Sequence, residues 1–324
     1  MPTKKKTTRR VPRLLNIRSK RHLAQRLRIP IDVLENVAHY AALHYNPTRT
    51  RVKKDSKALR EIDAPQRLLK RIQREIHQLL SSLWLPDSIH GYRCGRSIVT
   101  AASPHAGRYF WWKADIRGFY PAISARNVYT MFTELGCSPN VARILTRLCT
   151  RNHHLPQGAP TSPALANLYL RISGVADRFA GLASQHHLNV TFFGDDILVS
   201  SDHPFSGLQH HMAQIVAQAG LRLHPDKTTA LLGPDERHGA LGIITNSRGV
   251  ALDVPKSYRR HLRTLLFLCR RHGPGILSLR GISQRDPRRF LAGKIGFAVQ
   301  INPKNAILFQ QLDSIDWTRS TDAA

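Results

Sequence analysis

The sequence predicts an α+β fold in which helices outnumber strands. Long stretches such as residues 65–85 carry apolar side chains at helical spacing. Two short β-prone runs, residues 190–193 and 197–200, flank a tight Gly-Asp-Asp turn and predict a hairpin. Residues 240–253 predict further strands. With 324 residues, 42% of them hydrophobic, the chain can bury a sizeable core in one large domain or in two or three lobes.

The N-terminal part predicts a basic tail followed by helices. Residues 1–18 are interpreted as the tail, and its first ten residues lack the apolar core of a signal peptide, so we expect a cytoplasmic protein. Ser19 can cap a first helix, and residues 31–45 carry apolar residues at helical spacing. Residues 47–57 predict a basic link or a hairpin.

The segment 65–85 predicts a strongly amphipathic helix. Its apolar face is formed by Leu68, Leu69, Ile72, Ile76, Leu79, Leu80 and Leu83. Its opposite face is basic and carries Arg67, Lys70, Arg71 and Arg74. Such a face is either simply solvated or contacts a nucleic acid, and Lys70 and Arg71 are our candidates for RNA binding.

The middle of the chain places a loop, a strand and several helices in order. Residues 90–97 form a Gly-punctuated basic loop that can approach phosphates closely. Residues 109–114 predict a buried strand that ends at Asp115, a typical position for a metal ligand. Helices are predicted over residues 126–135 and 140–150. A rigid turn with three prolines covers 155–163, and a single helix is predicted over 164–179.

After the acidic hairpin the chain becomes largely helical again. Helix 205–220 is followed by a strand over residues 221–223 and a loop that contains Lys227. The strands around Gly242 come next. Basic helices are predicted over residues 258–271 and, with gaps, over 280–299.

The charge balance predicts a polyanionic partner. Lys and Arg number 49 against 21 Asp and Glu, which gives a net charge of +28. Self-repulsion at this charge opposes compaction, so binding to nucleic acid is the most economical explanation, and an anionic membrane surface is the alternative. No apolar run approaches the roughly 20 residues of a membrane span. The four cysteines (Cys94, Cys137, Cys149 and Cys269) have no CxxC spacing, and no HExxH pattern occurs, so neither supports a zinc or redox site.

Asp195 and Asp196 are the strongest candidates for catalysis. Two adjacent like charges cost stability unless a cation shares them, and hard divalent cations such as Mg²⁺ prefer carboxylate oxygens. Paired metal ions are a known means of driving phosphoryl transfer. The alternative is a solvated Asp-rich turn, since turns favour Asp and Gly in any case.

Four motifs in one order resemble a known enzyme family. They are Asp-Ile-Arg-Gly-Phe-Tyr-Pro-Ala-Ile at 115–123, Leu-Pro-Gln-Gly-Ala-Pro-Thr-Ser-Pro-Ala-Leu-Ala-Asn-Leu at 155–168, Phe-Gly-Asp-Asp at 193–196, and Lys227. This set resembles the reverse transcriptase palm, above all the bacterial branch of retron and group II intron enzymes. The resemblance covers about residues 60–250.

The resemblance implies a right-hand polymerase fold with fingers, palm and a helical thumb. Residues 19–110 would form the N-terminal helices and fingers. Residues 111–250 would form the palm with the catalytic aspartates, with a fingers segment interleaved at about 140–165. Residues 251–324 would form a basic helical thumb.

The resemblance also implies roles in the chemistry. Asp115 and Asp195 would bind two Mg²⁺ ions, with Mn²⁺ as an alternative, and Asp196 would be the weaker or shared ligand. The backbone at Ile116 would border the metals and the triphosphate. Lys227 would donate a proton to the leaving pyrophosphate; the alternative is a solvated loop lysine.

The same comparison implies residues that contact the nucleotide and the primer. Tyr120 would exclude a ribose 2′-OH, and its alternative role is a core aromatic. Gln157 and Gly158 would border the incoming nucleotide. Gly242 would belong to a hairpin that supports the primer. Two further candidates for phosphate contacts are Arg93 and Arg96.

Within the family, retron enzymes are the best match. Residues 90–105 resemble the retron segment that ends in Asn-Ala-x-x-His, with Ala101 in place of the Asn and with Ala102 and His105 retained. The retron Val-Thr-Gly signature reads Ala-Leu-Gly at 240–242, and Phe-Gly-Asp-Asp stands where Tyr-Ala-Asp-Asp is usual. The basic helix that starts near residue 258 would contact RNA through Arg259, Arg260 and Arg263.

A retron enzyme is an RNA-directed DNA polymerase. The resemblance therefore implies synthesis from a 2′-OH of a cognate structured RNA, with dNTPs as substrates and an RNA–DNA hybrid as intermediate. The product would be RNA-linked single-stranded DNA, and an effector protein would act with the enzyme in anti-phage defence. One alternative is another defence-associated or intron-like reverse transcriptase. A second, of another class, is an RNA-binding scaffold or antitoxin with secondary polymerase activity.

Overall fold

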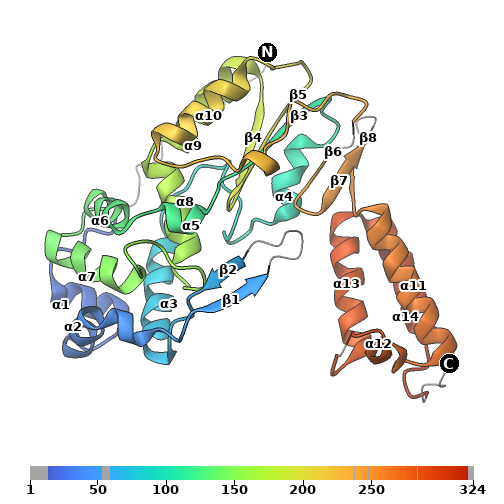
Figure 1. Cartoon of the computed structure of the whole chain (residues 1–324), viewed down its shortest axis with the longest axis horizontal. Coiled ribbons are helices and arrows are strands. Elements are labelled where there is room, and N and C mark those ends of the chain that lie inside the picture. The colour runs from blue at the N-terminus through green and yellow to red at the C-terminus, as the bar shows by residue number, and fades with distance from the viewer. Residues whose placement is uncertain (1–13, 53–58, 237, 247–248, 283, 320–324) are drawn as a thin grey trace, which may run out of the picture. The chain divides into compact units, whose positions relative to one another are not determined.

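The computed structural model describes residues 14–52, 59–236, 238–246, 249–282 and 284–319 (Figure 1). The predicted α+β class is confirmed: helices combine with small antiparallel sheets. The chain divides into two compact units. The first contains Met1–Ser97, Lys113–Leu198 and Phe205–Thr229, and the second contains Ile98–Trp112, Val199–Pro204 and Ala230–Ala324.

The first unit is mostly helical. Its helices are α1 Lys20–Leu27, α2 Ile31–His39, η1 Ala41–His44, α3 Arg67–Ser81, α5 Phe119–Ala122, α6 Ala125–Glu134, α7 Pro139–Cys149, α8 Ser162–Ile172, α9 Val175–His186, α10 Leu208–Gln218 and η3 Pro225–Lys227. The predicted cap at Ser19 is present, since its side chain accepts a hydrogen bond from His22 N at 3.1 Å.

The last residues of the predicted basic tail (residues 1–18) pack against the first unit. Leu15 and Ile17 are buried, and Leu15 N donates to Leu135 O at 2.9 Å. Ser138 N in turn donates to Ile17 O at 3.0 Å. Two buried apolar side chains therefore tie this segment to the first unit, while residues 1–13 lie outside the described part.

Helix α3 follows the predicted amphipathic pattern with one exchange. Leu69, Ile72, Ile76 and Leu80 are buried as expected, but Leu68 is 39% exposed and Gln73 is fully buried. The Gln73 amide nitrogen donates to Tyr45 Oη at 3.0 Å and to Leu148 O at 2.8 Å. A buried amide is tolerated because it finds hydrogen-bond acceptors on neighbouring elements.

The single helix predicted over residues 164–179 is wrong. The structure has two helices there, α8 and α9, which are separated by Ser173 and Gly174. Gly174 has φ +78°, a left-handed conformation that ends a helix and that glycine adopts at little cost. The apolar residues continue at helical spacing through the break, so periodicity alone concealed it. The predicted strand 221–223 is likewise reduced to an isolated bridge between Leu223 and Ile116.

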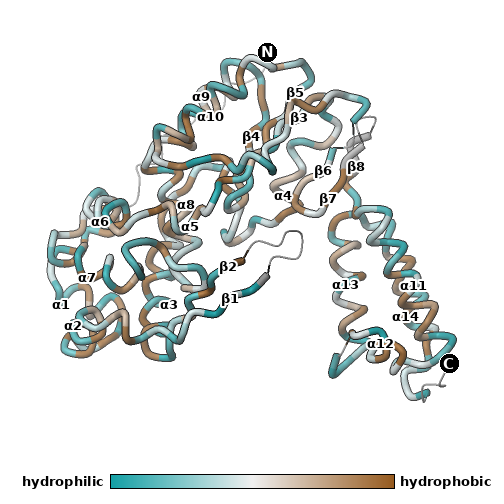
Figure 2. The backbone as a smooth tube through the Cα atoms, in the orientation of Figure 1, coloured by the Kyte–Doolittle hydropathy of each residue, from teal (hydrophilic) through white to brown (hydrophobic). Residues whose placement is uncertain are grey.

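The acidic hairpin belongs to a three-stranded sheet, and a separate two-stranded sheet follows the first helices of the chain. Strands β3 Phe110–Asp115, β4 Asn189–Phe193 and β5 Asp196–Ser201 form a sheet in the order β3-β5-β4, and Figure 2 shows hydrophobic residues along β4. β3 and β5 each run from one unit into the other. The predicted link at 47–57 is part of a wider hairpin, in which β1 Arg49–Val52 pairs with β2 Leu59–Ile62; its tip is not described.

The second unit combines a three-stranded meander with basic helices. Its elements are α4 Ile98–Ala102, η2 Ser103–His105, β6 His238–Ala240, β7 Ile243–Asn246, β8 Gly249–Asp253, α11 Lys256–His272, α12 Ile276–Leu279, α13 Pro287–Ile301, η4 Pro303–Ala306 and α14 Ile307–Asp313. Gly242, with φ +77°, lies in the turn between β6 and β7. The helix predicted from residue 280 starts only at Pro287.

Helices α11, α12, α13 and α14 of the second unit share an apolar cluster. α11 contributes Leu262, Leu265, Leu266 and Cys269, and α13 contributes Leu291 and Ile295. Figure 2 shows hydrophilic and hydrophobic residues alternating along α11, as this one-sided burial requires. In the described part of the chain, no helix has the length and apolar character needed to cross a membrane.

Candidate active site

Asp115 and the acidic hairpin meet because of how the central sheet is ordered. Asp115 ends β3 and is only 6% exposed, and Asp196 begins β5, the neighbouring strand. Gly194 and Asp195 form the hairpin turn, with Gly194 at φ +65°. Ile116 N donates to Asp195 O at 2.8 Å, so the turn is fixed directly to the end of β3.

Lys227 is brought to Asp115 by backbone pairing. Arg117 N donates to Arg222 O at 2.8 Å, and His224 N donates to Asp115 O at 2.7 Å. The following loop, which contains η3, then turns back along β3. In this arrangement Lys227 Nζ donates to Asp115 Oδ2 and forms an ion pair with it. The structure thus joins four predicted site residues: Asp115, Asp195, Asp196 and Lys227.

The cluster holds more negative charge than its surroundings neutralise. Burial, followed by repulsion from Asp195 and Asp115, raises the pKa of Asp196 to about 7. Partial burial alone would lower the pKa of Lys227, but the hydrogen bond with Asp115 and the three carboxylates raise it above its usual range. Burial lowers the pKa of Lys113, against the opposing effect of Asp196.

The donor set suits a hard divalent cation. Three carboxylates lie close enough to repel one another, and oxygen ligands of this kind bind Mg²⁺ or Mn²⁺. A cation would relieve the repulsion that raises the pKa of Asp196. Among the described residues no three acidic, thiol or imidazole groups already stand in a metal-binding arrangement, and the Lys227 ammonium occupies one oxygen of Asp115.

The predicted nucleotide loop is supported by a buried ion pair. Asp63 N donates to Gln157 O at 2.7 Å, and the Asp63 carboxylate pairs with Arg151 at 2.6 Å. Gly158 has φ +111°, and a Cβ there would lie 3.1 Å from Asp63 O. Both the backbone conformation and the close approach therefore require glycine at position 158.

Three other predicted substrate contacts have clear placements. Tyr120 is partly buried on α5, a single turn that follows Gly118 and Asp115. Arg93 donates to Pro86 O at 2.9 Å and to Ile89 O at 3.2 Å, and burial together with the charge of Arg96 lowers its pKa. Arg96 pairs with Asp87 at 2.7 Å. Both guanidinium groups thus already have partners in their own loop.

The residues behind the hairpin were missed by sequence reasoning. A Cβ on Gly91 would lie 2.5 Å from Gly194 N, so these two backbones are in direct contact. Asn167 is buried, and its Nδ2 donates to Gly91 O at 2.7 Å. Asn167 was inside a recognised motif, but no local pattern indicated a partner 76 residues away. Lys113, by contrast, could have been found, because positions 113 and 115 share one face of a strand.

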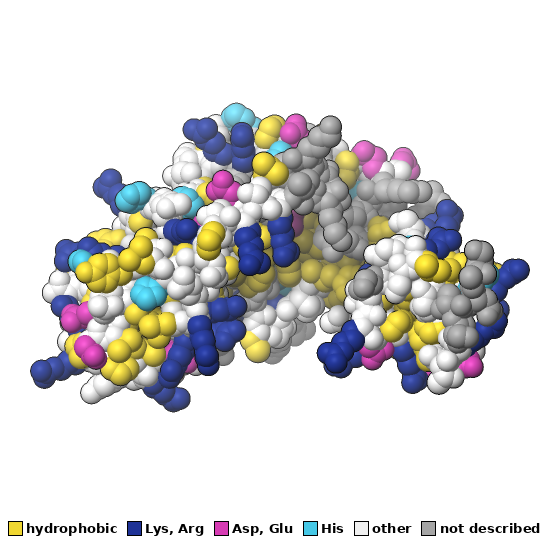
Figure 3. All heavy atoms as spheres, turned by 60° about the horizontal axis from the view of Figure 1, so that its bottom comes forward, with side chains coloured by type: hydrophobic (Ala, Val, Ile, Leu, Met, Phe, Trp, Pro, Cys, Tyr) yellow, Lys and Arg dark blue, Asp and Glu magenta, His cyan; other side chains and the backbone are white. Residues whose placement is uncertain are grey.

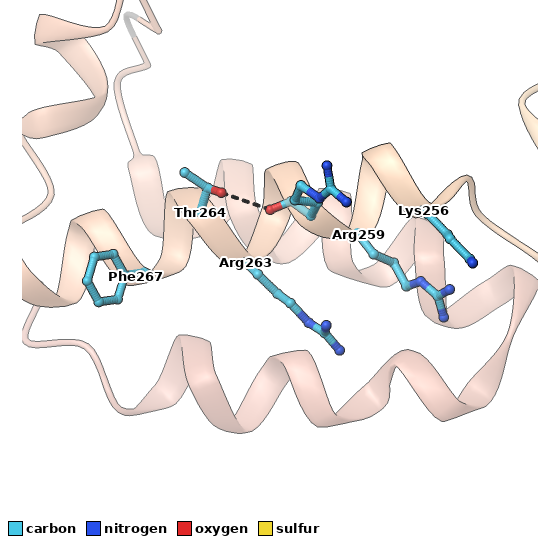
Figure 4. A pocket seen from close by; sticks show the side chains of 6 residues that line it. Lys256, Arg259, Arg263, Thr264 and Phe267 are labelled. Atoms are coloured by element: carbon cyan, nitrogen blue, oxygen red, sulfur yellow. Dashed lines mark hydrogen bonds between the residues drawn. The ribbon is translucent and has the colours of Figure 1, made fainter.

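The predicted RNA contacts are exposed cations on two helices. Lys70 and Arg71 lie on the exposed face of α3. In the second unit, α11 borders an open groove of about 600 Å³ lined by Lys256, Arg259, Arg260, Arg263, Thr264 and Phe267 (Figure 4). Figure 4 shows Lys256, Arg259 and Arg263 directed to the same side of α11. Basic side chains also outnumber acidic ones on the face in Figure 3.

Comparison with known proteins points to one enzyme family. Residues 52–291 match the family model for reverse transcriptase (RNA-dependent DNA polymerase). Retron Ec86 reverse transcriptase of Escherichia coli is 30% identical over 240 residues, which cover 72% of this chain and 73% of that protein. Retron Mx65 reverse transcriptase of Myxococcus xanthus is 28% identical over 319 residues, which cover 89% and 70% respectively.

Proposed function

This chain belongs to the retron reverse transcriptases, and from that premise we propose that Asp115, Asp195 and Asp196 hold the divalent cations of its polymerase reaction. As a family member, the chain is an RNA-directed DNA polymerase. One observation carries the proposal: three carboxylates and Lys227 form a single cluster whose backbone is fixed by hydrogen bonds.

The residues of the cluster divide the work of phosphoryl transfer. Two bound Mg²⁺ ions would neutralise charge on the reacting phosphate and make the priming hydroxyl more acidic. Asp115 and Asp195 would provide oxygens for both ions, and Asp196 would be the weaker or shared ligand. Lys227 keeps its proton because its neighbours raise its pKa, so its Nζ can protonate the leaving pyrophosphate.

The nucleotide and the RNA are assigned to separate surfaces. Tyr120 excludes a ribose 2′-OH, and Gln157 and Gly158 border the incoming dNTP, with Arg93 and Arg96 near its phosphates. The basic faces of α3 and α11 bind the RNA template and the RNA–DNA hybrid mainly through phosphates, in keeping with the net charge of +28.

The proposed product is RNA-linked single-stranded DNA. The enzyme copies a cognate structured RNA, starts from a 2′-OH of that RNA, and acts with an effector protein in anti-phage defence. The similarity to several retron enzymes supports this product, as do the retained Ala102 and His105 of the retron segment. Sequencing nucleic acid that co-purifies with the protein tests it, and RNA or DNA without a covalent junction would contradict it.

The catalytic assignment is tested by removing the two hairpin carboxylates. We expect Asp195→Ala with Asp196→Ala to abolish extension of a DNA primer on an RNA template while RNA affinity is kept. Asp235→Ala, which removes an exposed carboxylate outside the cluster, serves as the control. Continued extension by the double variant would refute the metal site. A double variant that still protects cells fully would favour the RNA-binding scaffold.

A further inference from the structure

The backbone ahead of Tyr92 lies directly against the acidic hairpin. His90 N donates to Phe192 O at 2.8 Å, and Phe192 N donates to Ser88 O at 2.7 Å, so this segment pairs with β4. Gly91 then touches Gly194, where a Cβ would come within 2.5 Å of Gly194 N. The position of Tyr92 beside the hairpin turn is therefore set by the backbone contacts of the residues that precede it.

Tyr92 has an unusual combination of backbone and side-chain properties. Its φ of +55° lies in the left-handed region that side chains with a Cβ rarely adopt. Its side chain is 59% exposed, so burial does not repay this strain. Its ring pairs with that of Phe193 at a centroid distance of 6.2 Å and an angle of 33°. A strained, exposed aromatic residue beside catalytic groups points to a function.

Gly194 is part of the same arrangement. A Cβ at position 194 would lie 3.3 Å from Tyr92 Cε2, closer than ordinary contacts. The family usually has Ala here and Tyr at position 193. In this chain position 194 has no Cβ, and the ring of Tyr92 packs close to where one would lie. The glycine at position 194 thus gives the ring of Tyr92 room beside the hairpin turn.

We propose that Tyr92 is a positioning residue whose ring, together with Phe193, supports the base of the nucleotide that carries the priming hydroxyl. Nucleobases stack on exposed aromatic rings regardless of sequence. Phe193 lies two residues before Asp195, at the metal site that the attacking hydroxyl must reach. The incoming dNTP is assigned to the Gln157 loop, where Gln157 O accepts a hydrogen bond from Asp63 N. The proposal rests on the metal site proposed above.

The test removes the ring without disturbing the backbone. Tyr92→Gly suits this purpose because glycine adopts φ +55° without strain, so the variant should fold at least as well as the parent. His153→Gly is the matched control: His153 is also exposed and has φ +63°, but it lies outside the hairpin. Tyr92→Phe separates the ring from its hydroxyl.

Extension is measured on an RNA template with two DNA primers, one of which has an abasic 3′-terminal nucleotide. For Tyr92→Gly, extension of the intact primer should be roughly tenfold slower than for the parent or His153→Gly, the size of one base–aromatic stack, with the KM for dNTP unchanged. Loss of the terminal base removes its pair with the template in every variant, so it slows extension in all of them, but its cost should be roughly tenfold smaller for Tyr92→Gly than for the parent, because the ring no longer contributes. Tyr92→Phe should keep the preference for the intact primer.

Two results would overturn the proposal. If the effects of the abasic terminus and of Tyr92→Gly multiply independently, the ring does not support the terminal base. If Tyr92→Gly raises the KM for dNTP instead, the ring contacts the incoming nucleotide. Both differ from failure of the metal site, which would appear as extension by the Asp195→Ala and Asp196→Ala double variant.

Discussion

The acidic hairpin and the basic face of α11 carry their charges in opposite ways. At the hairpin a few carboxylates are partly buried, and glycines at positions 91 and 194 allow backbones to touch. On α11 the cations are exposed along a helix, and among the described residues no acidic group pairs with Arg260 or Arg263. Binding at the hairpin would depend on the exact position of each carboxylate, whereas binding at α11 would depend on the sum of its positive charges.

This contrast predicts how each region responds to substitution. Phosphoryl transfer requires its ligands to be placed accurately, so a small displacement at the hairpin should cost much activity. Phosphate binding adds up over several cations, so the loss of one from α11 should cost little. A complete loss of RNA binding on substitution of one cation of α11 would contradict this contrast.

The largest effect is expected at Asp115. Asp115→Asn keeps the shape of the side chain but removes a cation ligand and the partner of Lys227. We expect single-turnover extension to fall by about a thousandfold or more, with RNA affinity unchanged. A loss below about tenfold would show that Asp115 is not a ligand in the reaction.

Gly91→Ala should have the next largest effect, although Gly91 has no chemical role. The new Cβ would lie 2.5 Å from backbone nitrogen of Gly194, so the hairpin must move. We expect a loss of about 1–3 kcal/mol in the free energy of unfolding and roughly a hundredfold loss of activity. Gly181→Ala in α9 is the control, because nothing lies within 4 Å of its Cβ position. Equal behaviour of the two variants would contradict the backbone contact.

The same contrast explains what could be predicted from the sequence. The cluster of Asp115, Asp195, Asp196 and Lys227 was predicted because the motifs that contain these residues occur in a recognisable order. Gly91, Tyr92 and Asn167 act on the hairpin through contacts that span 76 residues or more, and local patterns carry no information on such pairs. Helix breaks such as the one at Gly174 were missed because the apolar period continues across them.

A pH effect on stability is expected from the segment behind the hairpin. Burial, followed by the charges of Arg96 and Arg93, lowers the pKa of His90 from 6.5 to about 4. Between these values the unfolded chain binds a proton that the folded chain does not. The contribution of neutral His90 to the free energy of unfolding is therefore fully present above pH 6.5. It is lost as pH falls towards 4, with a slope of at most about 1.4 kcal/mol per pH unit.

Urea unfolding at pH 7 and pH 5 measures this effect. His90→Gln removes the titrating group, so its stability should change less between the two pH values than that of the parent. His153→Gln is the control, since His153 is exposed. An identical pH dependence for the parent and His90→Gln would show that the burial of His90 does not affect proton binding.

The smallest effect is expected on α11, where two arginines can be compared one helical turn apart. Arg259 pairs with Asp253 at 2.8 Å, whereas Arg263 has no acidic partner among the described residues. Arg263→Ala should therefore leave thermal stability unchanged, weaken RNA binding only a few-fold, and reduce the slope of log affinity against log salt by about 1. Arg259→Ala should also lower the free energy of unfolding, by up to about 1 kcal/mol, because Asp253 loses its ion-pair partner.

If Arg263→Ala leaves the salt slope unchanged, α11 does not bind phosphates. If it abolishes RNA binding at every salt concentration, α11 acts by position, as the hairpin does, and not through its summed charge.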